Sequence, residues 1–70
     1  MKTFKLDDEF IQLDKLLKLL RIAQSGGEAH LLVDDGLVKV NGVTENRRRA
    51  KLRVGDTIDV EGVSIKIVSK

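Results

Sequence analysis

Residues 25–42 (S-G-G-E-A-H-L-L-V-D-D-G-L-V-K-V-N-G) constrain the fold more than any other part of the chain. Ser25 is followed three residues later by Glu28, the spacing of a capping box at the start of a helix. Three apolar residues after it fall on one helical face. Gly36 can take the left-handed conformation that ends a helix. The segment therefore predicts a helix that begins after Ser25 and stops at Gly36.

A strand and a hairpin should follow this helix. Residues 37–40 alternate lysine with valine, as a half-buried strand does. Asn41-Gly42 is a strong hairpin signal, because a type I′ turn needs positive φ at both positions. Its partner strand is residues 43–44. By the same pattern we predict strands at residues 2–6, 52–54, 57–60 and 63–67, with turns at Gly55-Asp56 and Glu61-Gly62.

An earlier helix is indicated by four leucines. Leu13, Leu16, Leu17 and Leu20 are spaced at i, i+3, i+4 and i+7, which places them on one face. The predicted helix covers residues 13–20. Only a short segment separates it from the helix after Ser25, so the two should lie against each other as an αα corner. The predicted fold class is α+β: a single domain, residues 1–70, with the corner packed on one side of a small, bent, mainly antiparallel sheet of about four to five strands.

Composition excludes several classes of protein. The chain has 70 residues and no Cys, so disulfides and thiolate metal sites are excluded, and one His is too few for the usual zinc sets. No apolar run approaches the 18 residues of a membrane span. The N-terminal segment is basic and then acidic, without the apolar centre of a signal peptide. We therefore expect a cytoplasmic protein that uses no cofactor.

Catalysis is poorly supported. The single His30 has no Ser or Asp partner at a diagnostic spacing, and there is no Cys or Tyr. The adjacent carboxylates Asp34 and Asp35 point to different faces and do not form a dyad. The chain is therefore not expected to be an enzyme.

Charge is distributed unevenly along the chain. Residues 1–35 carry 5 basic and 7 acidic side chains, whereas residues 36–70 carry 8 basic and 4 acidic ones. Between Lys39 and Arg53 six basic residues stand against one acid, Glu45. A basic surface on a nearly neutral domain is typical of a polyanion site.

The order of these elements resembles the S4 RNA-binding domain, also called the alpha-L motif. The pattern G-x-V-x-V-N-G after an αα corner, followed by V-G-D, carries the resemblance. A small stand-alone bacterial subfamily is closer still, with Q-S-G-G before the second helix and N-R-R after the hairpin. The matching residues are Leu13-Asp14, Gln24-Ser25-Gly26-Gly27, Ala29, Leu32-Val33, Gly36, Val38, Val40, Asn41-Gly42, Asn46-Arg47-Arg48-Arg49 and Val54-Gly55-Asp56.

The resemblance implies the alpha-L fold and binding to structured RNA, first of all ribosomal RNA. In typical members an Arg precedes Leu-Asp in the first helix, and one or two Arg follow the cap of the second. This chain has Gln12 in the first place and Gly26 and Gly27 in the second, and His30 replaces a frequent Arg. The bare backbone of the two glycines at a helix N-terminus and the run of arginines can supply the missing contacts.

The predicted RNA-binding residues come from both helices, the hairpin and the charged segment after it. They are Lys15, Lys18, Arg21, Ser25, Gly26, Gly27, His30, Lys39, Asn41, Arg47, Arg48, Arg49 and Lys51.

Each candidate has a plainer interpretation. The arginine run can be a solvated loop, the two glycines a tight turn, and the helix lysines an ordinary polar face. His30 can be a half-exposed helix residue, and Lys39 an exposed strand lysine. Phe4 and Phe10 are too few for a stacking platform, so we expect both in the core and expect recognition by shape and phosphate.

Two functional hypotheses remain from the sequence. The first is a monomeric RNA-binding protein, associated with a ribosomal particle or its precursor during assembly or translation. The second is a protein-interaction or assembly adaptor that keeps the fold without strong RNA binding, because the expected arginines are absent at Gln12, Gly26 and Gly27.

Overall fold

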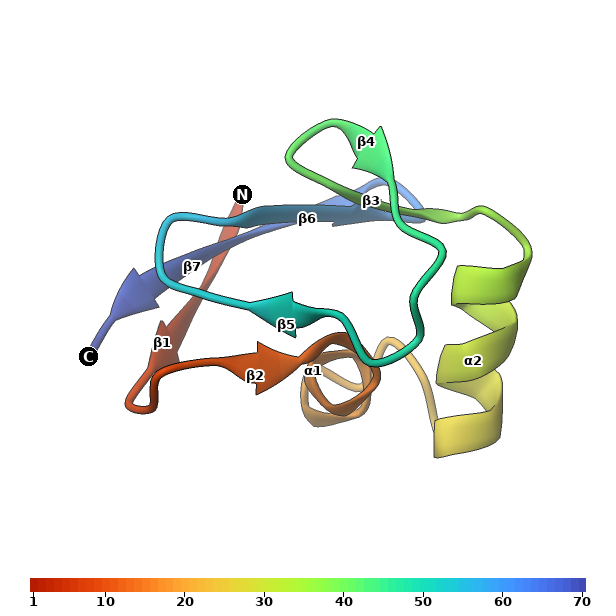
Figure 1. Cartoon of the computed structure of the whole chain (residues 1–70), viewed down its shortest axis with the longest axis horizontal. Coiled ribbons are helices and arrows are strands. Elements are labelled where there is room, and N and C mark those ends of the chain that lie inside the picture. The colour runs from red at the N-terminus through yellow and green to blue at the C-terminus, as the bar shows by residue number, and fades with distance from the viewer.

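A five-stranded sheet forms one layer of the molecule, and two short helices cover it (Figure 1). The computed structural model describes the whole chain, residues 1–70. In chain order the elements are β1 (Lys2–Leu6), β2 (Ile11–Gln12), α1 (Leu13–Leu19), α2 (Gly26–Asp34), β3 (Val38–Val40), β4 (Val43–Thr44), β5 (Lys51–Leu52), β6 (Thr57–Val60) and β7 (Val63–Ser69).

The strand order in the main sheet is β1-β7-β6-β3-β4. Neighbours are antiparallel except β1 and β7, which are parallel and pair the first strand with the last. A parallel pair needs a long crossover, and here the crossover contains the rest of the domain. The predicted mainly antiparallel α+β class is confirmed.

The core lies between this sheet and the helices. All sixteen buried residues are apolar. The predicted leucine face of α1 supplies Leu13, Leu16 and Leu17, and the strands supply inward residues such as Ile58 and Ile65, each with no more than 1% of its surface exposed. Phe4 packs against this core as expected, but the prediction for Phe10 is wrong: its ring is only half-buried and lies outside the core cluster.

Both helices end in the same hydrogen-bonded motif. Gly36 has φ of 73°, and the next N–H, that of Leu37, donates to the Leu32 carbonyl, which is the Schellman pattern expected for glycine. The end of α1 repeats the pattern with Arg21, whose φ is 59°, followed by a bond from Ile22 N–H to Leu17 O. Arginine therefore occupies a position that favours glycine.

The start of α2 and the hairpin turn agree with the local sequence signals. Ser25 Oγ accepts the Glu28 N–H at 3.2 Å, although the Glu28 carboxylate does not return a bond to the Ser25 N–H. Half of the predicted capping box is therefore formed. Asn41 and Gly42 have φ of 53° and 84°, as a type I′ turn requires.

A second, two-stranded sheet differs from the prediction. The predicted strand at residues 52–54 is instead β5, Lys51–Leu52, which pairs with the unpredicted strand β2. Val54 lies in a turn closed by a hydrogen bond from Asp56 N–H to Arg53 O. The apolar side chain of Val54 suggested a strand, but it is half exposed.

Neither α1 nor α2 has the length and apolar character that a helix needs to span a membrane.

The left-handed Arg21 generates a stability prediction. Replacing Arg21 with glycine removes the steric conflict between its Cβ and the backbone, and should raise the free energy of unfolding by about 1 kcal/mol. Urea unfolding followed by circular dichroism measures the change. The control Lys18→Gly, inside α1, should lower stability by about 1 kcal/mol. An Arg21→Gly variant that is no more stable than the parent would contradict a steric cost of arginine at this helix end.

Candidate nucleic-acid interface

The connector, residues 45–50 between β4 and β5, is fixed to the start of α1 through its backbone. The N–H groups of Leu13 and Asp14 donate to the carbonyls of Ala50 (2.9 Å) and Arg48 (3.1 Å). Such N–H groups find no partner within their own helix, and Gln12 supplies no side-chain cap. The connector therefore caps α1, which fixes its basic residues relative to that helix.

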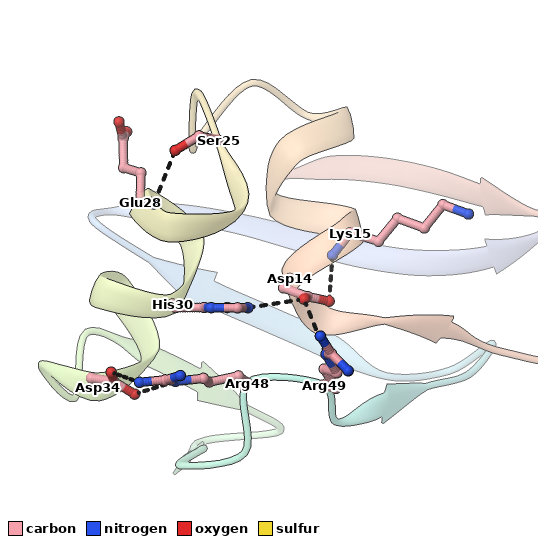
Figure 2. Close-up of polar contacts among 8 residues, drawn as sticks. All are labelled: Asp14, Lys15, Ser25, Glu28, His30, Asp34, Arg48 and Arg49. Atoms are coloured by element: carbon pink, nitrogen blue, oxygen red, sulfur yellow. Dashed lines mark hydrogen bonds and ion pairs between the residues drawn. The ribbon is translucent and has the colours of Figure 1, made fainter.

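Arg48 and Arg47 form ion pairs with carboxylates of the protein itself. The guanidinium of Arg48 donates through Nε and Nη2 to the two oxygens of Asp34, at 3.0 and 2.5 Å, and so joins the connector to the end of α2 (Figure 2). Arg47 makes a similar two-point contact with Glu45, at 3.1 Å for each bond. Exposed ion pairs add little stability, so their main effect is to orient the arginines.

Asp14 brings three elements together (Figure 2). Its carboxylate, only 13% exposed, accepts the Lys15 N–H at 2.8 Å and lies 3.1 Å from His30 Nε2 of α2. Arg49 Nε of the connector lies 3.9 Å from the same carboxylate, while 73% of the Arg49 side chain stays exposed. One acidic side chain therefore aligns His30 and Arg49 at the junction of the two helices.

Basic side chains surround an open depression of about 470 Å³ beside this junction. Its lining is Arg47, Arg49, Ala50, Lys51 and Arg53 and contains no acidic residue. We call this hollow the basic depression. Two of these cations lie over the ring of Phe10, which lines the other hollow of the molecule: Lys51 Nζ is 4.9 Å and Arg53 Cζ 6.0 Å from the ring centroid. A concave surface with one sign of charge concentrates an oppositely charged ligand.

A second hollow, of about 480 Å³, lies beside β1 and α1. Its charged residues are Lys5, Lys15, Asp7 and Asp8, so cations and carboxylates balance. It therefore lacks the charge bias of the basic depression and fits a polyanion less well.

Gly26 and Gly27 form the first turn of α2, behind the Ser25 cap. Neither has positive φ, and a Cβ on either would meet nothing closer than 3.9 Å. Neither a tight turn nor close packing therefore requires glycine at these positions. The Lys18 ammonium lies 4.0 Å from where a Cβ of Gly26 would be.

The structure groups some predicted residues and separates others. Asp14 brings His30 and Arg49 together, and the basic depression gathers Arg47, Arg49 and Lys51. The Lys15 side chain points away from Asp14 (Figure 2) and lines the second hollow. Lys39 and Asn41 lie instead on the β3–β4 hairpin. The Asn41 amide donates to Asp56 Oδ1 (3.0 Å), and its oxygen accepts the Thr57 N–H (2.9 Å), so this side chain joins the hairpin to the start of β6.

Sequence reasoning missed Arg53 and the carboxylates that orient the arginines. Arg53 belongs to a segment in which the apolar residues Ala50 and Leu52 alternate with basic ones. This alternation could have predicted that the Arg53 side chain faces outward. The pairing of Asp34 with Arg48 joins residues 14 positions apart, and no local pattern encodes it. No group of three His, Cys, Asp or Glu residues could hold a metal ion.

The ion pairs change the acidity of two carboxyl groups. The hydrogen bond from Arg48 holds the pKa of Asp34 below its usual range, and the one from Arg47 does the same for the pKa of Glu45, in each case against a smaller opposing effect of burial. The same bonds raise the pKa values of Arg47 and Arg48. Both pairs therefore stay charged at neutral pH.

Comparison with known proteins places the chain in a family. The profile of the S4 domain matches residues 4–68. The chain belongs to the S4 domain family. YbcJ of Escherichia coli (strain K12) is 37% identical over 70 residues, covering 99% of this chain and all of YbcJ. "Probable ribosome maturation protein RlbA" of Bacillus subtilis (strain 168) is 44% identical over 57 residues, covering 81% of this chain and 80% of that one.

A solved structure gives the same fold for this S4 family member. The solution structure of YbcJ superposes with a TM-score of 0.75 at 37% identity and covers 99% of this chain and 89% of that one. It is described as revealing an alpha-L motif involved in RNA binding. The alpha-L architecture expected from the sequence is thus confirmed.

The two ion pairs generate a pH prediction with an internal control. In Arg48→Ala the pKa of Asp34 should rise toward its ordinary value of about 3.9 while that of Glu45 stays lowered, and Arg47→Ala should do the reverse. Carboxyl chemical shifts in an NMR titration measure both values.

The stability consequence has a definite sign. A lowered native pKa contributes stability that is fully present above the unfolded pKa and is lost as the pH falls through the native value. The difference in free energy of unfolding between the parent and Arg48→Ala should therefore be present at pH 6, begin to shrink near the unfolded pKa of about 3.9, and disappear only below the lowered native pKa of Asp34. An Asp34 pKa that is equal in the parent and in Arg48→Ala would show that the pair does not form in solution.

Proposed function

We propose that this S4 domain is a non-catalytic RNA-binding protein that recognises structured RNA, ribosomal RNA in the first place, through phosphate contacts. The observation that carries the proposal is the basic depression, where four exposed cations and no carboxylate line one hollow. Guanidinium and ammonium groups bind phosphate strongly, and arginine can do so at two points. The connector fixes Arg47 and Arg49 against α1, and the pairing of β5 with β2 fixes Lys51 beside them, which limits the conformational entropy lost on binding.

The two helices extend the same surface in this proposal. His30 and Arg49 flank Asp14, whereas the side chain of the next residue, Lys15, points away from them (Figure 2) and lines the second hollow. At the N-terminus of α2 the glycine backbone leaves room for a phosphate, with Lys18 nearby. Arg21 lies between the helices. Lys39 and Asn41 belong to the periphery, since Asn41 already uses its amide within the fold.

The relatives support this assignment. The YbcJ structure is described as an alpha-L motif involved in RNA binding, and RlbA is named as a probable ribosome maturation protein. By analogy we propose a role in ribosome assembly or translation, in the cytoplasm, as a monomer that associates with a ribosomal particle or its precursor. No cofactor enters the proposal.

A second candidate function is a protein-interaction or assembly adaptor. It is favoured by Gln12, Gly26 and Gly27, which stand where the family resemblance expects arginines. The ion pair of Arg48 with Asp34 also neutralises one cation near the surface that would face RNA. The basic depression outweighs these departures, because it restores a cationic surface next to α1.

Sedimentation of the tagged protein in cell lysate distinguishes the two functions. At low salt the protein should comigrate with a ribosomal particle or its precursor, and it should be released by RNase or by high salt, as expected when counterions drive binding. The triple variant Arg47→Ala, Arg49→Ala, Lys51→Ala should be found mostly at the top of the gradient under conditions where the parent comigrates.

The matched control removes three cations elsewhere: Lys2→Ala, Lys5→Ala, Lys70→Ala. It should sediment like the parent. A protein at the top of the gradient under every condition would contradict a ribosomal target. A complex that survives RNase would support the adaptor function instead.

A further inference from the structure

We propose that Arg47, Arg49, Lys51 and Arg53, hereafter the phosphate strip, follow the backbone of one strand of an RNA double helix with one cation for each phosphate. The inference rests on the proposed function. It specifies an RNA duplex as the ligand and names the side chains that contact its phosphates. It assigns a binding role to Arg53 and withdraws one from Arg48.

The alternation of exposure along the chain defines the strip. Arg49, Lys51 and Arg53 are exposed, whereas Ala50 and Leu52 between them are 5% and 1% exposed. The apolar residues therefore anchor this segment to the core at every second position, and the cations point outward. Lys51 begins β5 and Arg53 follows that strand, and two residues of extended chain advance about 6.6 Å, so these two cations can meet neighbouring phosphates of one strand. Arg49 lies in the turn just before β5.

Arg47 joins the strip through a turn. The Ala50 N–H donates to the Arg47 carbonyl at 3.2 Å, which folds the chain so that Arg47 lines the same basic depression. Its side chain is 77% exposed. Of the Arg47 guanidinium nitrogens, Nε and Nη2 each donate one hydrogen bond to Glu45, and a guanidinium has five N–H donors. The remaining donors are available to a phosphate.

Arg48 is excluded although it is the middle of the arginine run. Like Arg47, it gives two guanidinium bonds to a carboxylate, in this case that of Asp34 on α2 (Figure 2). Unlike Arg47, it does not line the basic depression. Its function is to hold the connector on α2. Arg48 therefore lies between two strip residues in the sequence but does not contact RNA in this proposal.

The surroundings of the strip favour a helical RNA over splayed single-stranded bases. Single-strand binders present aromatic faces on which bases stack. This chain has two phenylalanines and no Tyr or Trp. The one ring at the strip, Phe10, already has Lys51 and Arg53 against it. Double-stranded RNA is recognised by its shape, its phosphates and its 2′-hydroxyls, and a row of cations without a stacking platform matches phosphate recognition.

Fluorescence anisotropy with a labelled 16-base-pair RNA duplex tests the strip. Binding is measured between 50 and 200 mM salt for the parent and for each strip residue changed to alanine. Each single variant should weaken binding and reduce the slope of log K against log salt by about 0.9, and the fourfold variant should reduce it by about 3.6. Over this salt range a slope of that size corresponds to a roughly 100-fold change in affinity.

Two control variants each remove one positive charge, as the single strip variants do. Lys2→Ala, on β1, should leave the slope unchanged. Arg48→Ala should also leave the slope unchanged, and it should lower the thermal midpoint only slightly, because the exposed pair with Asp34 adds little stability. All the changed side chains are exposed, and circular dichroism verifies that each variant is folded.

Several outcomes would overturn the proposal. Strip variants with the parental slope, an Arg48→Ala slope reduced as much as theirs, or tighter binding to a U16 single strand than to the duplex would each contradict the strip but leave RNA binding in place. A parent that binds neither the duplex nor ribosomal RNA would contradict the proposed function as well.

Discussion

The hydrogen bonds between the connector and the first turn of α1 organise the functional surface. They form because a helix start leaves N–H groups without partners, and Ala50 and Arg48 supply the carbonyls. The same contact extends the pairing of β2 with β5, where Ile11 faces Leu52. A single backbone interaction thus closes the small sheet, caps the helix and fixes the position of seven consecutive residues that carry five cations, from Arg47 to Arg53.

The carboxylates near this surface have a common effect. Asp14, Asp34 and Glu45 each contact an arginine of the connector. In a loop with three consecutive arginines the like charges repel, and neighbouring acids reduce that repulsion. As a result, Arg48 joins the connector to α2 through Asp34, while the cations that line the basic depression remain exposed. Net charge alone does not reveal this, because the acids near the surface cancel part of the charge without covering the depression.

The family fold tolerates this arrangement because the core is independent of it. All sixteen buried residues are apolar, and every charged group lies outside them. Changes at Gln12, Gly26 and Gly27 therefore alter the surface of the α1–α2 corner without cost to packing. In our proposal the main phosphate contacts come from the connector and β5, next to that corner, and the S4 fold serves as a rigid frame for a basic segment.

Local sequence determined the elements whose geometry is local. The leucine face of α1, the Ser25 cap, the positive φ at Gly36 and the Asn41-Gly42 turn each depend on residues a few positions apart, and each was predictable. The resemblance to the S4 domain implied the overall architecture, a helix corner on a small sheet, but not the strand order or the parallel pair of β1 and β7. Tertiary structure alone decided what each arginine does. Arg48 meets Asp34 and Arg49 approaches Asp14 across 14 and 35 positions of sequence, and β2 pairs with β5 across about forty. These pairings depend on how the packed core positions the backbone, and a short window of sequence does not encode that.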